Sequence, residues 1–125
     1  MIVIDAAALL ALLLDEEGAD TVKRVIRGSV MSAVNASECC SRAVERGGSA
    51  EGVIAIIRSF EVQIVPFDMD EAIAAAALRP LTRHVGASLG DRACLAAAQA
   101  RGVGVYTGDR RLAELDIGVD VRLIR

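Results

Sequence analysis

The amino-acid sequence predicts an α/β fold in which a mostly parallel sheet is flanked by helices on both faces. Short runs rich in β-branched residues alternate with longer helix-like stretches along all 125 residues, and this alternation is typical of α/β proteins. Strands that are joined through helices pair in parallel and need both faces covered. No linker rich in Pro, Gly or Ser interrupts the pattern, so residues 1–125 are expected to form one domain.

The first half of the chain divides into elements at residues that begin or end them. In order, we expect a strand at 2–4, helices at 6–14 and around 22–26, a strand at 30–32, and helices at 35–46 and 50–60. Val22, Val25 and Ile26 give the second helix an apolar stripe, and Gly28 closes it. A Gly–Gly pair at 47–48 ends the third helix.

The second half follows the same pattern. We expect a strand at 62–65, a helix at 68–78, a long helix at 88–101, a strand at 103–107, a short helix at 110–115 and a last strand at 121–124. Pro66 ends the first of these strands because proline cannot donate to a sheet. Pro80 prevents Arg79 from continuing the helix before it, and Gly102 ends the long helix.

Composition and charge exclude several classes of protein. Hydrophobic residues make up 54% and charged residues 25% of the chain, which excludes a disordered tail. Aromatic residues at 2% argue against binding nucleic acid mainly through stacking, and the net charge of −3 disfavours a nonspecific DNA binder. The three cysteines lack zinc-ligand spacing and form no disulfide framework, which favours a cytoplasmic setting. The longest apolar run, residues 6–14, is too short to cross a membrane.

Four carboxylates mark the expected functional edge of the sheet. In open α/β sheets, ligands bind at the carboxyl ends of the strands. Asp5 directly follows the first strand and Asp109 follows the fourth, while Glu38 and Asp91 lie in the first turns of their helices. Four oxygen donors of this kind suit Mg²⁺ or Mn²⁺, and such an ion would offset the repulsion among them.

Helix capping is the competing interpretation of each acid. Asp5 and Asp109 could be N-caps, and Asn35 to Glu38 and Ser88 to Asp91 have the spacing of capping boxes. Residues 68–71 are a useful comparison, because Asp68 also follows a strand and there forms a box with Glu71. Asp91 differs from a simple cap, since it shares a helix side with apolar residues at i+4 and i+7.

At these residues the sequence resembles the PIN-domain proteins, specifically the small toxin ribonucleases of VapBC toxin–antitoxin pairs. The matching segments are 2–6 (IVIDA), 32–38 (SAVNASE), 88–96 (SLGDRACLA), 107–110 (TGDR) and 121–124 (VRLI). They span nearly the whole chain, and the four acids occur in order with their flanking residues. One position departs from the pattern, because these toxins commonly carry Asp-Ala-Ser where this chain has Ala7. The missing hydroxyl is expected to affect metal binding or turnover.

The resemblance implies a five-stranded sheet in the order 3-2-1-4-5, which makes the first and fourth strands neighbours. It also implies that four acids form a catalytic pocket for Mg²⁺ or Mn²⁺, with Thr107 and Asn35 supporting the ligands. Those acids are Asp5, Glu38, Asp91 and Asp109. Five arginines are candidates to contact the RNA backbone: Arg79, Arg83, Arg92, Arg110 and Arg111.

The implied reaction is metal-dependent hydrolysis of RNA phosphodiester bonds to 5′-phosphate and 3′-hydroxyl ends. The implied partners are an RNA substrate, a second copy of the chain, and a small VapB-like antitoxin with an apolar segment and an arginine that enters the acidic pocket. Two alternatives remain open. One is a PIN-fold binding protein that lost catalysis, which Ala7 favours. The other is an acidic phosphoacceptor or phosphatase, which the lone Lys23, in an early helix, disfavours.

Overall fold

The computed structural model describes residues 1–125 and contains one five-stranded sheet. Its strands are β1 (Ile2–Ile4), β2 (Val30–Ser32), β3 (Gln63–Val65), β4 (Gly104–Thr107) and β5 (Val121–Leu123). Their order is β3-β2-β1-β4-β5 and every neighbouring pair is parallel. The predicted α/β class and strand order are therefore confirmed, and the carboxyl ends of all strands lie at one edge of the sheet.

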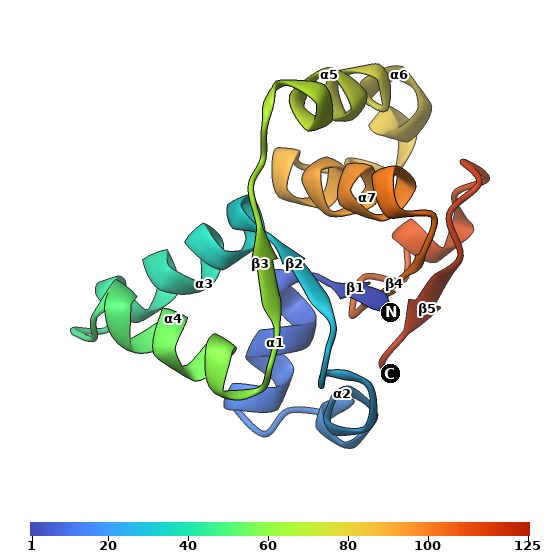
Figure 1. Ribbon diagram of the computed structural model, residues 1–125. Helices are drawn as coiled ribbons and strands as arrows, with labels where there is room; N and C mark the ends of the chain where they lie inside the picture. The colour runs from blue at the N-terminus through green and yellow to red at the C-terminus, as the bar shows by residue number, and fades with distance from the viewer.

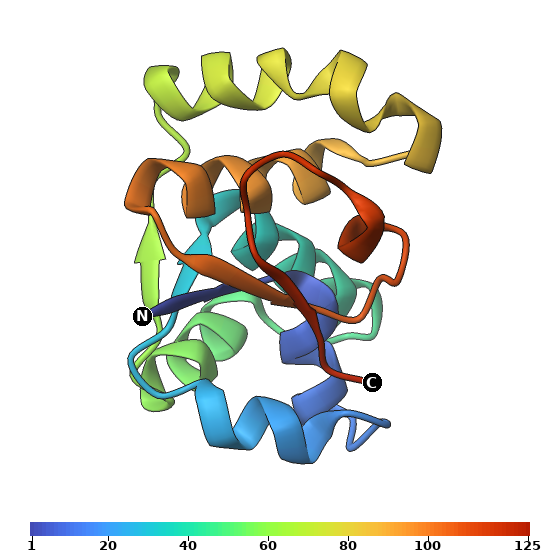
Figure 2. The ribbon, with the colours of Figure 1, turned by 90° about the vertical axis from the view of Figure 1, so that its right-hand side faces the viewer.

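Helices cover both faces of the sheet (Figure 1). One group consists of α1 (Ala6–Leu13), α2 (Ala19–Val25), α3 (Ala33–Glu45) and α4 (Ala50–Ser59). The other consists of α5 (Met69–Ala77), α6 (Arg79–Thr82), the 3₁₀ turn η1 (Arg83–Val85), α7 (Leu89–Arg101) and the 3₁₀ turn η2 (Leu112–Glu114). In Figure 2 the N-terminal strand runs through the middle of the molecule, between these groups. None of the helices is both long and apolar enough to span a bilayer.

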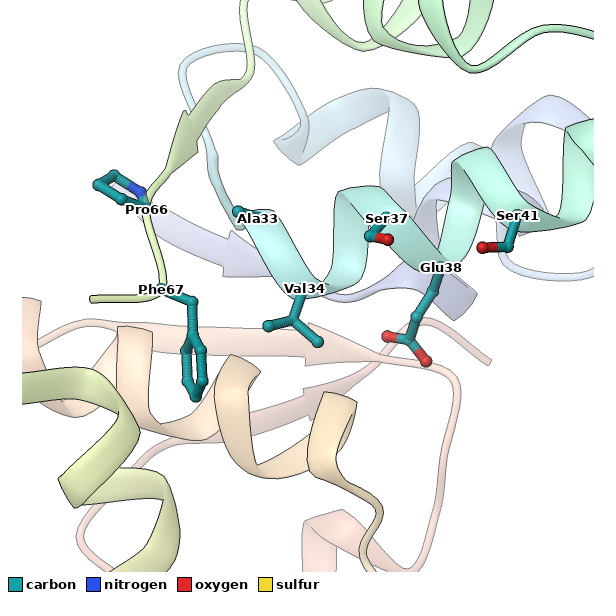
Figure 3. A pocket seen from close by; sticks show the side chains of 7 residues that line it. All are labelled: Ala33, Val34, Ser37, Glu38, Ser41, Pro66 and Phe67. Atoms are coloured by element: carbon teal, nitrogen blue, oxygen red, sulfur yellow. The ribbon is translucent and has the colours of Figure 1, made fainter. Parts of the chain in front are cut away.

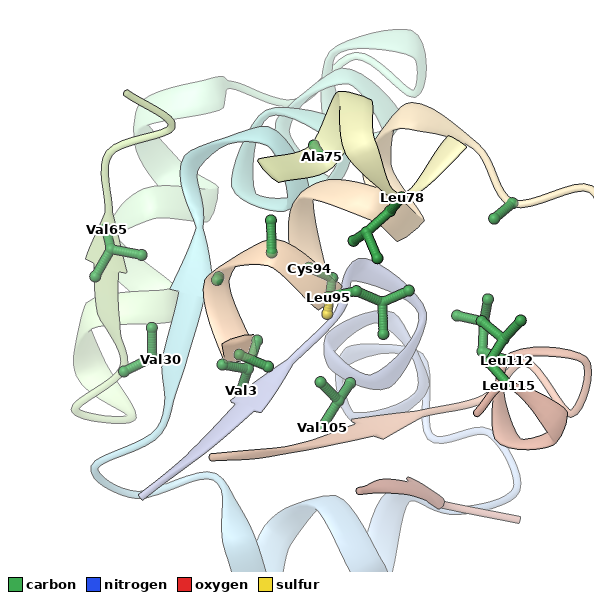
Figure 4. Packing of buried hydrophobic residues seen from close by; sticks show 14 of the residues in the cluster. Val3, Val30, Val65, Ala75, Leu78, Cys94, Leu95, Val105, Leu112 and Leu115 are labelled. Atoms are coloured by element: carbon green, nitrogen blue, oxygen red, sulfur yellow. The ribbon is translucent and has the colours of Figure 1, made fainter. Parts of the chain in front are cut away.

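Alternation along the strands builds a hydrophobic core on each face. In β1, Val3 joins the cluster beneath α5 and α7, whereas Ile4 joins the cluster on the side of α1 and α3. Val105 and Leu95 lie in the first cluster, and both are almost fully buried (Figure 4). Because side chains alternate between faces, the residue after Ile4 returns to the α7 side. The sheet therefore presents Asp5 to α7.

The structure corrects several predicted boundaries. Helix α3 begins at Ala33, because the Ser32 hydroxyl caps it by accepting a hydrogen bond from the Val34 amide at 3.2 Å. Asn35 therefore lies inside the helix and does not begin it. Helix α5 ends before Pro80 as predicted, but the sequence analysis missed α6, in which Pro80 occupies the first turn. The predicted helix at 110–115 is only the turn η2.

Candidate functional site

Asp5 and Thr107 meet at the carboxyl ends of the two central strands. The register pairs Ile4 with Tyr106, so the next residues on β1 and β4 are neighbours. Thr107 donates its hydroxyl hydrogen to Asp5 Oδ2 and accepts a hydrogen bond from the Asp109 amide at 3.0 Å. Asp5 Oδ1 accepts from the Ala8 amide at 2.8 Å, which caps α1. One buried hydroxyl thus links the segments that carry two of the predicted site acids.

Burial and neighbouring charge act together on Asp5. Desolvation is the largest influence and raises the pKa of Asp5 from 3.8 to about 6. The hydrogen bonds from Thr107 and Ala8 lower this pKa, whereas the charges of Asp91 and Glu38 raise it further. These two acids therefore lie close enough to add to the effect of burial on the Asp5 carboxylate, and we call Asp5, Glu38 and Asp91 the acidic unit.

Glu38 is held where α3 approaches α7. Asn35 is buried and donates from Nδ2 to Glu38 Oε1 at 2.8 Å and to the Gly90 carbonyl at 3.1 Å. A Cβ at Gly90 would overlap the Glu38 carboxylate, so glycine is the residue that admits this carboxylate beside α7. The predicted capping box between Asn35 and Glu38 is wrong, because these side chains bond to each other within the helix. Sequence reasoning also missed Gly90, whose signal is a glycine inside an otherwise regular helix.

Asp91 is both a cap and a member of the acidic unit. Its Oδ2 accepts from the Ser88 amide at 2.9 Å, and the Ser88 hydroxyl accepts from the Asp91 amide at 3.1 Å, which completes a capping box for α7. The predicted box is confirmed at this position. Asp91 nevertheless remains within electrostatic range of Asp5, so capping and a role at the site are compatible.

Asp109 is paired with Arg111, a contact that the sequence did not indicate. Asp109 Oδ1 accepts from the Arg111 amide at 3.0 Å and from Nε at 3.2 Å, and Oδ2 accepts from Nη2 at 2.9 Å. This pairing lowers the pKa of Asp109, although partial burial opposes the shift. The fourth predicted acid is thus bound to an arginine that we had expected to contact RNA.

The remaining arginines differ in their surroundings. Arg79, Arg83 and Arg110 are exposed, and their side chains make no hydrogen bond or ion pair. Arg92 instead donates from Nη1 to the Ala75 carbonyl at 3.1 Å, and its buried Nε has no partner. Its guanidinium therefore ties α7 to α5.

The comparison acid, Asp68, behaves as a cap. It is exposed, and its Oδ1 accepts from the Glu71 amide at 3.0 Å at the start of α5. Glu71 does not return a bond to it. The Glu71 carboxylate is instead buried and pairs with Arg101 of α7 at 3.4 Å. Asp68 thus stabilises a helix terminus and is not among the charges that shift the pKa of Asp5.

A hollow of about 500 Å³ adjoins Glu38 (Figure 3). Val34, Ser37 and Ser41 of α3 form one side, and Pro66 and Phe67 after β3 form another. In Figure 3 the Glu38 carboxylate points toward the edge of the sheet, beside Val34. The acidic unit is therefore bordered by a partly apolar surface.

The donor set fits a divalent cation, although the side chains do not converge on one. No three acidic, histidine or cysteine side chains lie close enough to share an ion. Carboxylate oxygens are nevertheless the ligands that Mg²⁺ and Mn²⁺ prefer, and positive charge would offset the repulsion from Asp91 and Glu38 that adds to the effect of burial on Asp5. The buried Asn35 Oδ1, which lacks a hydrogen-bond donor, marks a further unsatisfied oxygen next to Glu38.

Solved structures with the same fold include several toxin–antitoxin proteins. A toxin–antitoxin complex from Klebsiella pneumoniae has a TM-score of 0.76 at 19% identity, covering 100% of this chain and 98% of that chain. DNA-bound VapBC from Salmonella typhimurium has a TM-score of 0.73 at 17% identity, covering 100% of both chains. VapC20 of Mycobacterium tuberculosis, a toxin that cleaves the sarcin–ricin loop, has a TM-score of 0.70 at 18% identity, covering 96% of this chain and 99% of that chain.

Comparison of the sequence identifies a family but no individual relative. Curated protein sequences contain no significant match to this chain. The sequence model of the PIN domain, in contrast, matches residues 2–118. This range contains the four strands β1 to β4 and all four acids predicted at the site. The chain therefore belongs to the PIN-domain family.

Proposed function

We propose that this protein is a metal-dependent endoribonuclease and the toxin of a type II toxin–antitoxin pair. The observation that carries the proposal is the position of the acidic unit, Asp5, Glu38 and Asp91, after β1 and in the N-terminal halves of α3 and α7 of a PIN-domain fold. The reaction is hydrolysis of RNA phosphodiester bonds to 5′-phosphate and 3′-hydroxyl ends. The likeness to toxin structures supports the biological role.

In this proposal, Mg²⁺ or Mn²⁺ would be held by Asp5, Glu38, Asp91 and Asp109. When bound, such an ion activates water and offsets the negative charge that develops on the scissile phosphate. The chain's own residues prepare the ligands. Thr107 fixes one Asp5 oxygen, and Asn35 fixes one Glu38 oxygen. Both supporting residues are buried, so the carboxylates they contact are oriented before any ligand arrives.

Five arginines are proposed to contact the RNA backbone, and they fall into two groups according to their present contacts. Arg79, Arg83 and Arg110 are exposed and free to pair with phosphate, for which the guanidinium fork is well suited. Arg92 and Arg111 would first have to leave the Ala75 carbonyl and Asp109. The first group is therefore expected to contribute more to RNA affinity.

An antitoxin with an apolar segment and an arginine is the proposed inhibitor, and a homodimer is the proposed form of the toxin. The hollow beside Glu38 supports the first part, because Val34, Pro66 and Phe67 offer an apolar wall next to the carboxylates. An arginine that extends from a segment bound there would reach the acids, with which it forms strong charge-assisted hydrogen bonds. Several solved structures of this fold are toxin–antitoxin complexes.

The direct test is cleavage of a mixed RNA pool by the purified chain with Mg²⁺ or Mn²⁺, compared with chelator. We expect cleavage only with metal, and its loss in Asp5→Asn, Glu38→Gln, Asp91→Asn and Asp109→Asn. Asp68→Asn is the matched control, because it removes an acid that only caps a helix. Metal-independent cleavage, or equal loss in the control, would refute the site. End-labelling of the fragments tests for the 5′-phosphate.

The toxin role has a separate test. Expression of the parent chain without the product of the neighbouring gene is expected to arrest growth. Expression of Asp5→Asn under the same conditions is expected to leave growth normal. Normal growth despite soluble, metal-binding protein would count against a toxin. If the protein binds metal and RNA but cleaves none, the binding-only alternative gains support. An Ala7→Ser variant then tests whether the missing hydroxyl is responsible.

A further inference from the structure

The guanidinium of Arg111 occupies both oxygens of Asp109. Oδ1 accepts from Nε and from the Arg111 amide, and Oδ2 accepts from Nη2 at 2.9 Å. The same side chain extends to the loop before α7, where a Cβ at Gly86 would lie 3.3 Å from Nη1. Gly86 has a φ of +68°, a conformation that favours glycine. The guanidinium therefore spans from the end of β4 to the segment that leads to Asp91.

This pairing determines which acids are available to a cation. Asp91 and Glu38 are among the charges that raise the pKa of Asp5, after the larger effect of burial, whereas Asp109 is not. Arg111 neutralises the fourth acid locally, and no three acids lie close enough to share an ion. A carboxylate whose oxygens both accept from a guanidinium must give up that pairing, at least in part, to bind a metal.

The Arg111–Asp109 ion pair is exposed enough to dissociate readily. The Arg111 side chain is 59% exposed and that of Asp109 is 25% exposed. Exposed ion pairs contribute little to stability, because water screens the attraction and ordering both side chains costs entropy. A divalent cation carries twice the charge of a guanidinium and can therefore compete with it for the Asp109 carboxylate.

We propose that Arg111 is an internal counter-ion that competes with the divalent cation for Asp109. The inference rests on the proposed metal-dependent function and adds a control of metal affinity within the chain itself. In the metal-free protein, Arg111 holds Asp109. Cation binding displaces the guanidinium and recruits Asp109 as a ligand. Arg111 thereby raises the metal concentration at which the site fills.

The opposite role for Arg111 would be to position Asp109 for the metal. The two roles predict changes of opposite sign. If Arg111 competes, its removal strengthens Mn²⁺ binding; if it positions Asp109, its removal weakens Mn²⁺ binding. A general loss of one positive charge would also strengthen cation binding, so the experiment needs a control of equal charge.

Arg110 supplies that control. It is the adjacent residue, it is exposed, and its side chain makes no hydrogen bond or ion pair. Arg110→Ala and Arg111→Ala lower the net charge equally and change neighbouring positions. Arg111→Lys keeps the charge but replaces the two-pronged donor with a single ammonium group.

The test is titration of the metal-free full chain with Mn²⁺ by calorimetry, without RNA. We expect Arg111→Ala to bind roughly two- to fivefold more tightly than Arg110→Ala at low salt, the range of an exposed ion pair. Arg111→Lys should lie between Arg111→Ala and the parent chain. The difference should shrink in high salt, which screens the pair.

Each outcome bears on the inference. Tighter binding by Arg111→Ala than by Arg110→Ala supports competition, even if the parent chain binds too weakly to measure. Equal or weaker binding by Arg111→Ala, in a parent that binds Mn²⁺, overturns competition while the proposed function stands. Absence of binding in the parent and in every variant overturns both, and the silence of Arg111→Ala distinguishes that case from competition in a weakly binding parent.

Discussion

At the scale of single residues, Asp5 combines a structural role with its proposed role as a metal ligand, at a cost to stability. It caps α1 and accepts the Thr107 hydroxyl hydrogen, but it is buried and lies near other negative charges. Each role requires the carboxylate oxygens to stay in place. The charge that suits a metal ligand is therefore a liability in the metal-free protein.

This liability predicts a pH dependence for the metal-free chain. The pKa of Asp5 is about 6 in the folded protein, against 3.8 ordinarily, so the folded state binds this proton more tightly than the unfolded state. The Asp5 contribution to the free energy of unfolding is fully present below about pH 4 and is lost as the pH rises through 6. The loss amounts to at most about 3 kcal/mol.

Denaturant unfolding in chelator, from pH 4 to pH 7, checks this. The stability of the parent relative to Asp5→Asn should fall across the window, because asparagine does not titrate. Parallel curves for the two proteins would contradict the assignment. Thr107→Val should move the transition to higher pH, since the hydroxyl lowers the pKa of Asp5.

Gly90 gives a second prediction at this scale. In Gly90→Ala, the new Cβ would overlap the Glu38 carboxylate, which can move because it is the exposed end of a flexible side chain. Alanine stabilises a helix relative to glycine, by up to about 0.5–1 kcal/mol, and Gly90 is the second residue of α7. We therefore expect unchanged or higher thermal stability in chelator, with weaker stabilisation by Mn²⁺ and less cleavage.

Glu38→Asp, whose side chain is shorter, should partly restore metal binding in Gly90→Ala. A fall in the chelator melting temperature would instead indicate a packing defect.

At the scale of elements, α5 and α7 begin with similar patterns that have different consequences. Asp68, the N-cap of α5, accepts from the Glu71 amide in the first turn, whereas Asp91, in the first turn of α7, accepts from the amide of the N-cap residue Ser88. Asparagine keeps an acceptor at either position, so Asp68→Asn and Asp91→Asn should each change the free energy of unfolding in chelator by no more than about 1 kcal/mol. Only Asp91→Asn should lose the stabilisation that Mn²⁺ confers.

Melting curves of both variants, in chelator and in Mn²⁺, separate capping from metal binding. If Asp91→Asn is stabilised by Mn²⁺ as strongly as the parent, Asp91 is a cap and nothing more. If Asp68→Asn also loses the response, the metal site has been placed wrongly.

The elements also show what sequence could and could not predict. The first strand was found because residues 2–4 are a short, apolar, β-branched run that ends at Asp5. The start of α3 was wrong because Ser32 and Asn35 are both good capping residues, and only the backbone path decides between them. The role of Thr107 came from resemblance, since its contact with Asp5 depends on strand order. The pairing of Asp109 with Arg111 is a choice of rotamer, which no spacing rule determines.

At the scale of the whole molecule, the two hydrophobic cores share one sheet and are expected to unfold together. Leu9 lies in the core beside α1 and Leu95 in the core beneath α7, and both are fully buried. Leu9→Ala and Leu95→Ala should each lower the free energy of unfolding by about 2–5 kcal/mol. Both variants should still unfold in a single transition. Two separate transitions in either variant would show that the faces are independent units.

The central position of β1 in the sheet affects how the protein folds during its synthesis. Asp5 and Thr107 are 102 positions apart in sequence, and β1 pairs with β4 along its whole length. Parallel pairing between such distant segments is slow, because a long loop must close before any contact compensates for the lost entropy. During synthesis, β1 can pair with β4 only after residues 104–107 have emerged from the ribosome. The four acids of the proposed site come from distant segments, so the growing chain carries no complete site before Asp109 has been added.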